Sequence, residues 1–227
     1  MIVSLRRVLK YIRNWNRVHE LVKYPISSEV SLSAEFEGAN RIGEKCVFNG
    51  KMGYGTYMGD LNNLTATIGR FTSIGHNCSI LTGRHPYTYP YVSTSPMFFS
   101  LRKQTGISFA KEQVFKEEHI FADSDSKYQI EIGNDCWIQS EVKFVAGIHI
   151  ADGVVVLSGA VVTKDIPPFA IVGGVPARII KYRYCEEDIQ FLMRYRWWSK
   201  DIEWIRMHWE LFNNIEQFKN IVCNDNK

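Results

Sequence analysis

The stretch ILTGRHPYTYPYVSTSPMFFS, residues 80–100, sets a histidine among aromatic and hydroxyl side chains. The imidazole of His85 can accept a proton near neutral pH, and a hydroxyl group must lose its proton when it acts as a nucleophile. A histidine beside Pro86 can also have a purely structural role, so the residues alone leave two interpretations open. Both interpretations stay open at this point, and His85 is a candidate general base.

The residues after His85 indicate how an acceptor molecule could be held. Tyr87 offers an aromatic face, and Ser93 and Thr94 offer hydroxyls that could orient the acceptor or the histidine. Apolar rings with a few converging polar groups are typical of sites for a sugar or a flat drug. We predict that Tyr87, Ser93 and Thr94 bind substrate, although loop hydroxyls often serve only to form turns.

These residues open a long segment without a sustained hydrophobic period, residues 83–128. A loop of this length inside a compact domain is uncommon unless it is functional. The sequence therefore predicts an inserted loop that carries part of the site.

On both sides of the loop an apolar residue recurs at every sixth position. After the loop this series is Ile132, Ile138, Phe144, Ile150, Val156 and Val162. A second series two places earlier is Ile130, Cys136, Val142, Ile148, Val154 and Ala160. Before the loop the same double series contains Ile68, Ile74 and Ile80 with Ala66, Thr72 and Cys78, and, more loosely, Phe36, Ile42, Phe48 and Tyr54. The register breaks between residues 55 and 67.

A period of six describes short strands joined by tight corners, with three strands closing one coil of about 18 residues. Such a coil cannot bury its inner face alone, so several coils must stack on one another. The sequence therefore predicts a parallel β-helix. Cys46, Cys78 and Cys136 fall on its small inward positions, where a thiol most simply serves packing.

The stretch IGNDCWIQSEVKFVAGIHIADGVVVLSGAVVTKDIPPFAIVGGVPARIIKYRY, residues 132–184, resembles the hexapeptide-repeat acyltransferases, in particular the xenobiotic and sugar O-acetyltransferase branch. The resemblance covers roughly residues 30–210 and departs from the family pattern at Gln139, where glycine is usual, and at Arg178, which keeps a positive charge. It implies a left-handed coil, a homotrimer with active sites between subunits, and acetyl-CoA as co-substrate. It also implies that His85 is the loop histidine that acts as the base.

The same resemblance implies a donor site at the end of the repeats. Lys164, Arg178 and Lys181 match the positions that hold the phosphates of the donor, and Ser140, Ser158 and Thr163 match those that line its groove. Arginine offers a bidentate fork and lysine a point charge for a phosphate. A solvated charged face is the alternative explanation of these cations.

The predicted fold is mainly β: a left-handed parallel β-helix over residues 29–184, interrupted by the loop 83–128. An amphipathic N-terminal helix, residues 1–28, and a helical C-terminal tail, residues 185–227, flank it. The N-terminal helix has Ile2, Leu5, Val8, Leu9 and Ile12 at helical spacing with basic residues between them. We expect it to pack on the protein's own trimer and keep contact with a membrane surface as the alternative. Four tryptophans of the tail, Trp197, Trp198, Trp204 and Trp209, are interpreted as packing.

Composition excludes several classes of function. A net charge of +3 with scattered lysines and arginines argues against nucleic acid as a partner. Five cysteines without CxxC spacing argue against a disulfide framework or a structural zinc site and favour a reducing cytoplasm. No apolar run is long enough to span a membrane. A catalytic metal would need a ligand triad, which the spacing of His76, His85, His119 and His149 does not set out, so we expect no metal.

The sequence thus predicts an acetyl-CoA-dependent O-acetyltransferase that transfers acetyl directly to a sugar hydroxyl, in a precursor of a cell-envelope polysaccharide. An antibiotic O-acetyltransferase of the chloramphenicol or streptogramin type is the alternative. A scaffold whose repeats only mediate assembly is a third possibility, which the aromatic loop and the TKDIPP terminus argue against.

Overall fold

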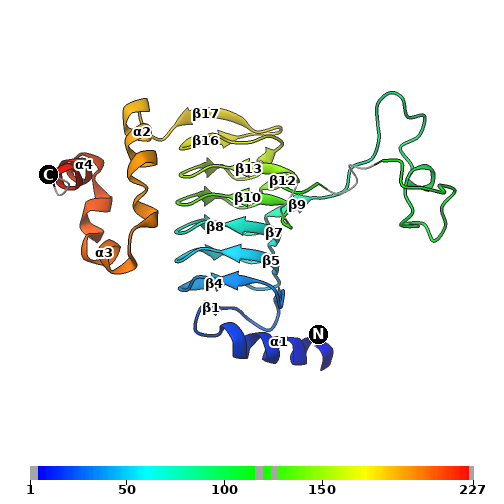
Figure 1. Cartoon of the computed structure of the whole chain (residues 1–227), viewed down its shortest axis with the longest axis horizontal. Helices are drawn as coiled ribbons and strands as arrows, with labels where there is room; N and C mark the ends of the chain where they lie inside the picture. Colours follow the sequence, from blue (N-terminus) through cyan, green and yellow to red (C-terminus); the bar gives the residue numbers. More distant parts are fainter. Residues whose placement is uncertain (1–4, 116–119, 124–126, 225–227) are drawn as a thin grey trace. The chain divides into compact units, whose positions relative to one another are not determined.

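The computed structural model describes residues 5–115, 120–123 and 127–224, and the side chains from residue 8 to residue 223 within these ranges. The chain divides into two compact units, residues 1–183 and 184–227. The first unit is a parallel β-helix with one N-terminal helix, and the second is helical (Figure 1). The predicted fold class, including the long inserted loop, is confirmed.

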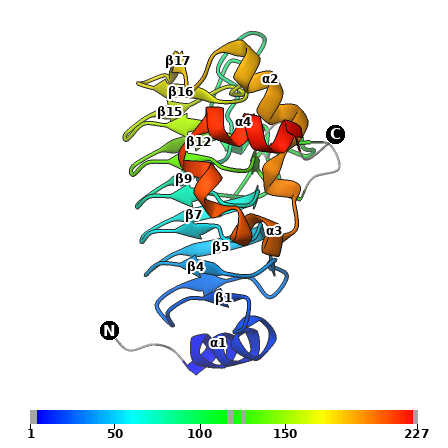
Figure 2. The same ribbon diagram turned by 90° about the vertical axis from the view of Figure 1, so that its left-hand side faces the viewer.

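Two long sheets run along the β-helix, and almost every strand pair is parallel (Figures 1 and 2). The first sheet has the order β1 (Val22–Lys23), β4 (Asn40–Ile42), β6 (Tyr57–Met58), β8 (Ser73–Ile74), β11 (Trp137–Ile138), β14 (Val155–Val156), β16 (Ala170–Gly173) and β17 (Arg178–Tyr182). The second has β13 (Ile148–Ile150), β10 (Ile130–Ile132), β7 (Asn63–Ile68), β9 (Ser79–Leu81), β12 (Lys143–Val145) and β15 (Val161–Val162), with β2 (Glu29–Val30), β3 (Glu35–Phe36) and β5 (Val47–Met52). Among the described strands, β17 alone is antiparallel, to β16, and it ends the stack.

The predicted double series forms the core. All twelve residues of the two series after the loop are buried, and so are Ile68 and Ile74 before it. Ile80, next to the loop, is partly buried and packs against the same core. Because successive side chains of a strand point to opposite faces, each short strand sends its inward residues to the shared interior.

The earlier coils correct one part of the prediction. The repeat predicted that Tyr54 points into the core. Tyr54 is instead half-buried, and Met52 is the residue that points inward there. The reason is that β5 and β7 run straight for six residues where a corner was expected, so Phe48 and Met52 both point inward. Phe48 pairs with Leu64, sixteen residues later, whereas Ile130 pairs with Ile148, eighteen residues later. The shorter coil explains the break in the sequence register.

Gly50 makes the straight run of β5 possible. It adopts φ 151°, and a Cβ atom there would collide with the backbone carbonyl oxygen of Ala66 in the next coil. Glycine is therefore required where the two long strands approach most closely.

The three inward cysteines serve packing, as predicted. Cys46, Cys78 and Cys136 are buried, and each thiol points at a backbone carbonyl of a neighbouring coil, for Cys136 that of Ala151 at 3.2 Å. Burial raises the pKa of the Cys136 thiol to about 12, so the nucleophilic thiolate is suppressed.

The helices lie at the two ends of the sequence. The N-terminal helix α1 (Leu5–Val18) precedes β1, and the predicted contribution of Ile2 lies outside the described residues. The second unit contains α2 (Glu186–Tyr195), η3 (Trp197–Ser199), α3 (Ile202–Met207), η4 (Trp209–Asn213) and α4 (Ile215–Asn224). Trp198 is buried in this unit, as a packing role requires, but Trp209 is 62% exposed. Among the described residues, no helix is both long enough and apolar enough to cross a bilayer.

Candidate active site

His85 is held by the backbone of its own loop. Its Nδ1 atom lies 2.7 Å from the carbonyl oxygen of Thr94. A carbonyl oxygen can only accept a hydrogen bond, so Nδ1 must carry the proton in this contact. The neutral ring then has its lone pair on Nε2, and the side chain is exposed. This is the tautomer that a general base needs.

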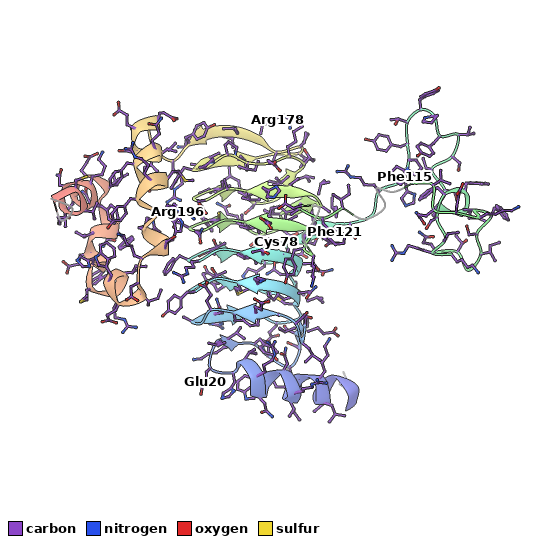
Figure 3. All side chains as sticks on the ribbon, viewed as in Figure 1. Glu20, Cys78, Phe115, Phe121, Arg178 and Arg196 are labelled. Atoms are coloured by element: carbon purple, nitrogen blue, oxygen red, sulfur yellow. The ribbon has the colours of Figure 1, made fainter. Side chains whose placement is uncertain are left out.

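Aromatic rings fix the plane of the imidazole. The ring of Phe99, which is buried, meets His85 edge to face with centroids 5.6 Å apart. Phe115 contacts Phe99 at 5.5 Å and Tyr91 at 5.7 Å, so the loop builds a small aromatic cluster of its own (Figure 3). This cluster is built from loop residues and orients the base.

The loop hydroxyls shape the backbone around His85. The Oγ atom of Ser93 accepts a hydrogen bond from the amide of Ser95, and Ser95 caps the short helix η1 (Pro96–Phe98). Thr94 contributes its carbonyl oxygen to the histidine. The role predicted for Ser93 and Thr94 in binding substrate therefore stays a prediction, beside a structural role that the geometry shows.

Tyr87 is the predicted substrate residue with the most open position. It is 82% exposed, and Tyr89, two residues later, is 95% exposed. Two accessible aromatic rings near an accessible base are suited to stacking against a sugar or a flat ring.

Three of the predicted donor residues share one corner of the β-helix. Ser140 and Ser158 occupy this corner in successive coils, where the amide of Gly159 donates to the carbonyl of Ser140. Arg178 pairs with Gly173 at the same corner of the next coil (Figure 3). Two hydroxyls and one guanidinium therefore follow one edge of the stack.

The other donor residues lie elsewhere. Thr163 and Lys164 directly follow β15. This strand pairs with β12, which pairs with β9, and β9 leads into the His85 loop. Lys181 pairs with Ile171 on the exposed strand β17. Within the described part of the chain, no hydrogen bond, ion pair or ring contact joins His85 to any of the six predicted donor residues.

We call the corner that carries Ser140, Ser158 and Arg178 the donor corner. Gln139 also lies there, although the sequence showed it only as a departure from the family pattern. Its Oε1 atom accepts hydrogen bonds from the amide of Ser158 at 3.2 Å and from the Ser158 hydroxyl at 2.9 Å. The side chain therefore bridges two coils, a contact that glycine could not make. The departure from glycine was the signal that identified this residue.

The described histidines do not gather into a metal triad. His76 accepts a hydrogen bond from the amide of Asp60 through Nδ1, at 3.0 Å, while His85 contacts Thr94. His149 lies near the carboxylates of Asp123 and Glu131, with all three ligand atoms within 4.8 Å of one another. His119, the fourth candidate in the sequence, lies outside the described residues.

No protein-family model matches the chain. Comparison with individual proteins finds several that are named acetyltransferases. A chloramphenicol acetyltransferase from Klebsiella aerogenes is 38% identical over 140 residues, 61% of this chain and 61% of that protein. A galactoside O-acetyltransferase from Escherichia coli K12 is 46% identical over 54 residues, 24% of this chain and 27% of that protein. The chain thus spans about three-fifths of the length of the first curated relatives it matches. A solved hexapeptide-repeat-containing acetyltransferase from Vibrio cholerae, complexed with acetyl coenzyme A, is 24% identical with 80% of each chain covered and a TM-score of 0.37.

Proposed function

The predicted resemblance to the hexapeptide-repeat acetyltransferases is confirmed by these relatives, and from it we propose that the chain is an acetyl-CoA-dependent O-acetyltransferase that modifies a sugar hydroxyl. The contact between His85 Nδ1 and the Thr94 carbonyl carries the proposal, because it leaves Nε2 as an exposed proton acceptor. A base in this state is what transfer to a hydroxyl requires.

The reaction needs no covalent intermediate on the enzyme. His85 takes the proton of the acceptor hydroxyl while that oxygen forms a bond to the thioester carbonyl carbon. The carbon–sulfur bond then breaks, and the thiolate takes up the proton that His85 has gained. Holding the two substrates side by side lowers the barrier through proximity.

The donor would lie along the corner that carries Ser140, Ser158 and Arg178. At that corner Arg178 supplies positive charge for its phosphates, and the small side chains of Ser140 and Ser158 let its arm approach the backbone. Gln139 lies at the same corner and bridges to Ser158. Thr163, Lys164 and Lys181 lie elsewhere in the same chain and stay predicted donor contacts.

We propose that the site is completed between copies of the chain in a homotrimer. Two observations within one chain support this proposal. Ser140 and Ser158 lie before the first residues of β12 and β15. The His85 loop leaves the last residue of β9, which pairs in parallel with β12, so the loop and the two serines lie at opposite ends of these strands. A second copy would supply the corner that faces the loop.

The open rings of Tyr87 and Tyr89 support a sugar acceptor, which we propose to be a precursor of a cell-envelope polysaccharide modified in the cytoplasm. A second candidate is the antibiotic O-acetyltransferase. The length of the match to the chloramphenicol acetyltransferase, 140 residues against 54 for the galactoside enzyme, favours it.

The decisive experiment measures thiol release from acetyl-CoA with two acceptor panels, one of sugars and sugar nucleotides and one of amphenicols and streptogramins. His85→Ala should lower turnover by a factor of about 10² to 10⁴, because it removes the proton-accepting Nε2 atom. Turnover with drugs alone would assign the chain to the second candidate. An undiminished rate in His85→Ala would refute His85 as the base.

A further inference from the structure

The helix α1 is attached to the β-helix through polar contacts and through the side chains of Tyr11 and Val18, which pack on or in the core. The amide group of Asn14, which is buried, donates to the carbonyl oxygens of Val30 at 3.2 Å and Ser31 at 3.4 Å. Arg17 donates to the carbonyl of Ala34 at 2.9 Å, and Val18 inserts into the core. The attached face therefore contains positions 11, 14, 17 and 18.

Three apolar side chains of the same helix are nevertheless exposed to solvent. Leu9 is 58% exposed, Ile12 is 49% exposed and Trp15 is 36% exposed. They follow one another at spacings of three, so they share one face of the helix. An amphipathic surface helix normally buries its apolar stripe against its own core. In α1 Trp15 contacts the rings of Tyr11 and Tyr24 on one side, while Leu9 and Ile12 stay exposed.

The charges beside this stripe are of one sign. Lys10 and Arg13 are exposed, and neither forms an ion pair within the described part of the chain. The helix contains no aspartate or glutamate. An exposed apolar stripe flanked by cations alone is complementary to an anionic layer with an apolar interior.

The helix also lies where a planar surface can reach it. Figures 1 and 2 both show α1 across the end of the β-helix, beyond β1, with no other element of this unit beyond it. Its outward face is therefore at a free end of the unit, and Trp15 provides an amphipathic ring of the kind enriched at membrane interfaces.

We propose that α1 is a docking surface for anionic lipid, on which the protein lies with Leu9, Ile12 and Trp15 in the headgroup region and Lys10 and Arg13 against phosphates. A second copy of the chain is a poorer occupant, because two such helices would bring only positive charges together. The proposal does not depend on the acetyltransferase activity, and its test does not use that activity.

The test is co-sedimentation of the full-length protein with vesicles of phosphatidylcholine alone or mixed with phosphatidylglycerol. We expect binding to the mixed vesicles only, weakened by salt because screening shortens the range of the attraction. Lys10→Gln/Arg13→Gln should weaken binding about 25-fold, since each basic residue near the surface contributes about a fivefold factor. Leu9→Ser/Ile12→Ser should weaken it at least tenfold by removing the inserted side chains.

The matched control is Lys111→Gln/Arg194→Gln, which removes two exposed positive charges outside α1 and should leave binding unchanged. All four substituted residues of α1 are exposed, so circular dichroism and the melting temperature should match the wild type. Equal binding of the wild type to both kinds of vesicle, or unchanged binding of both α1 variants, would overturn the proposal. A smaller assembly of Leu9→Ser/Ile12→Ser in analytical ultracentrifugation would show instead that a second copy covers the stripe.

Discussion

The Nδ1 atom of His85 lies 2.7 Å from the carbonyl oxygen of Thr94, nine residues further along the same loop. The partner of the histidine is thus a backbone atom, and the path of the loop sets its position. This hydrogen bond should therefore survive side-chain changes at Thr94, whereas changes that move the loop backbone should break it.

Replacing His85 with asparagine separates structure from chemistry. Asparagine keeps a donor that can reach the Thr94 carbonyl, but it offers no base. We expect kcat/KM to fall by about 10² to 10⁴, the range for a lost general base. Protease sensitivity of the loop should stay near that of the wild type in His85→Asn and increase in His85→Ala. Activity of His85→Asn within tenfold of the wild type would contradict the assigned role.

Phe99 should act as a positioning residue, because its buried ring packs against the imidazole. We expect Phe99→Ala to lower kcat at least tenfold, since a small misplacement of a catalytic group is costly. The KM for acetyl-CoA should not change, because the donor corner lies elsewhere. Phe98→Ala is the matched control, since Phe98 is 56% exposed and does not touch His85. Equal losses of kcat in the two variants would exclude the positioning role.

Gln139 and Ser158 should act as a pair on the donor side. Ser158→Ala removes the hydroxyl that donates to Gln139 at 2.9 Å, and one such bond contributes about 1 kcal/mol. We expect the KM for acetyl-CoA to change about fivefold in Ser158→Ala and in Gln139→Ala, with no further change in the double variant. Ser73→Ala, on the outer face of β8, should have no effect. Additive changes in the double variant would show that the two residues act separately.

The cysteines should differ sharply in reactivity. Cys185 and Cys223 are exposed, whereas Cys46, Cys78 and Cys136 are buried and burial raises the pKa of all three thiols. With iodoacetamide at pH 8, mass spectrometry should find two adducts on the native protein and five after denaturation. Rapid native labelling of Cys136 would show that the coil opens at that position.

The helical second unit should lose stability in acid. Lys219 donates to Asp188 at 2.6 Å, and this hydrogen bond holds the pKa of the Asp188 carboxyl below its usual value. A lowered folded-state pKa stabilises the fold above the unfolded-state pKa, and this contribution disappears as the pH falls through the folded-state pKa. Urea unfolding of Asp188→Asn should therefore show a loss of stability at pH 7 that vanishes near pH 2. A constant loss at both pH values would contradict the assignment.

The period of six was sufficient to predict the coils and their inward residues after the loop, because each coil there repeats the same three corners. It could not predict that Met52, and not Tyr54, points inward. Both side chains are apolar, and no turn residue marks the place where the expected corner is missing. Only the pairing of β5 with β7 shows that the coil is sixteen residues long there.

The sequence was sufficient to predict the chemistry of the candidate site, but not how its residues are held in place. The sequence identified His85, but its partner is a carbonyl oxygen, which every residue carries and no pattern reveals. The sequence also showed the apolar residues of α1. Periodicity alone, however, cannot tell which face of a helix is attached to the β-helix. That choice depends on Asn14 and Arg17, two polar residues that find carbonyl partners in the first coils.

The interruption of the coil by the loop also has a consequence for how the chain folds. Most contacts between neighbouring coils join residues sixteen or eighteen positions apart, but β7 meets β10 by pairing Ala66 with Ile130, 64 residues later. Closing that longer segment costs about 1 kcal/mol more conformational entropy than closing an ordinary coil. We therefore expect the two blocks of coils to meet at this seam about fivefold more slowly than an ordinary coil closes. The loop that carries the base would then also slow the folding of the chain.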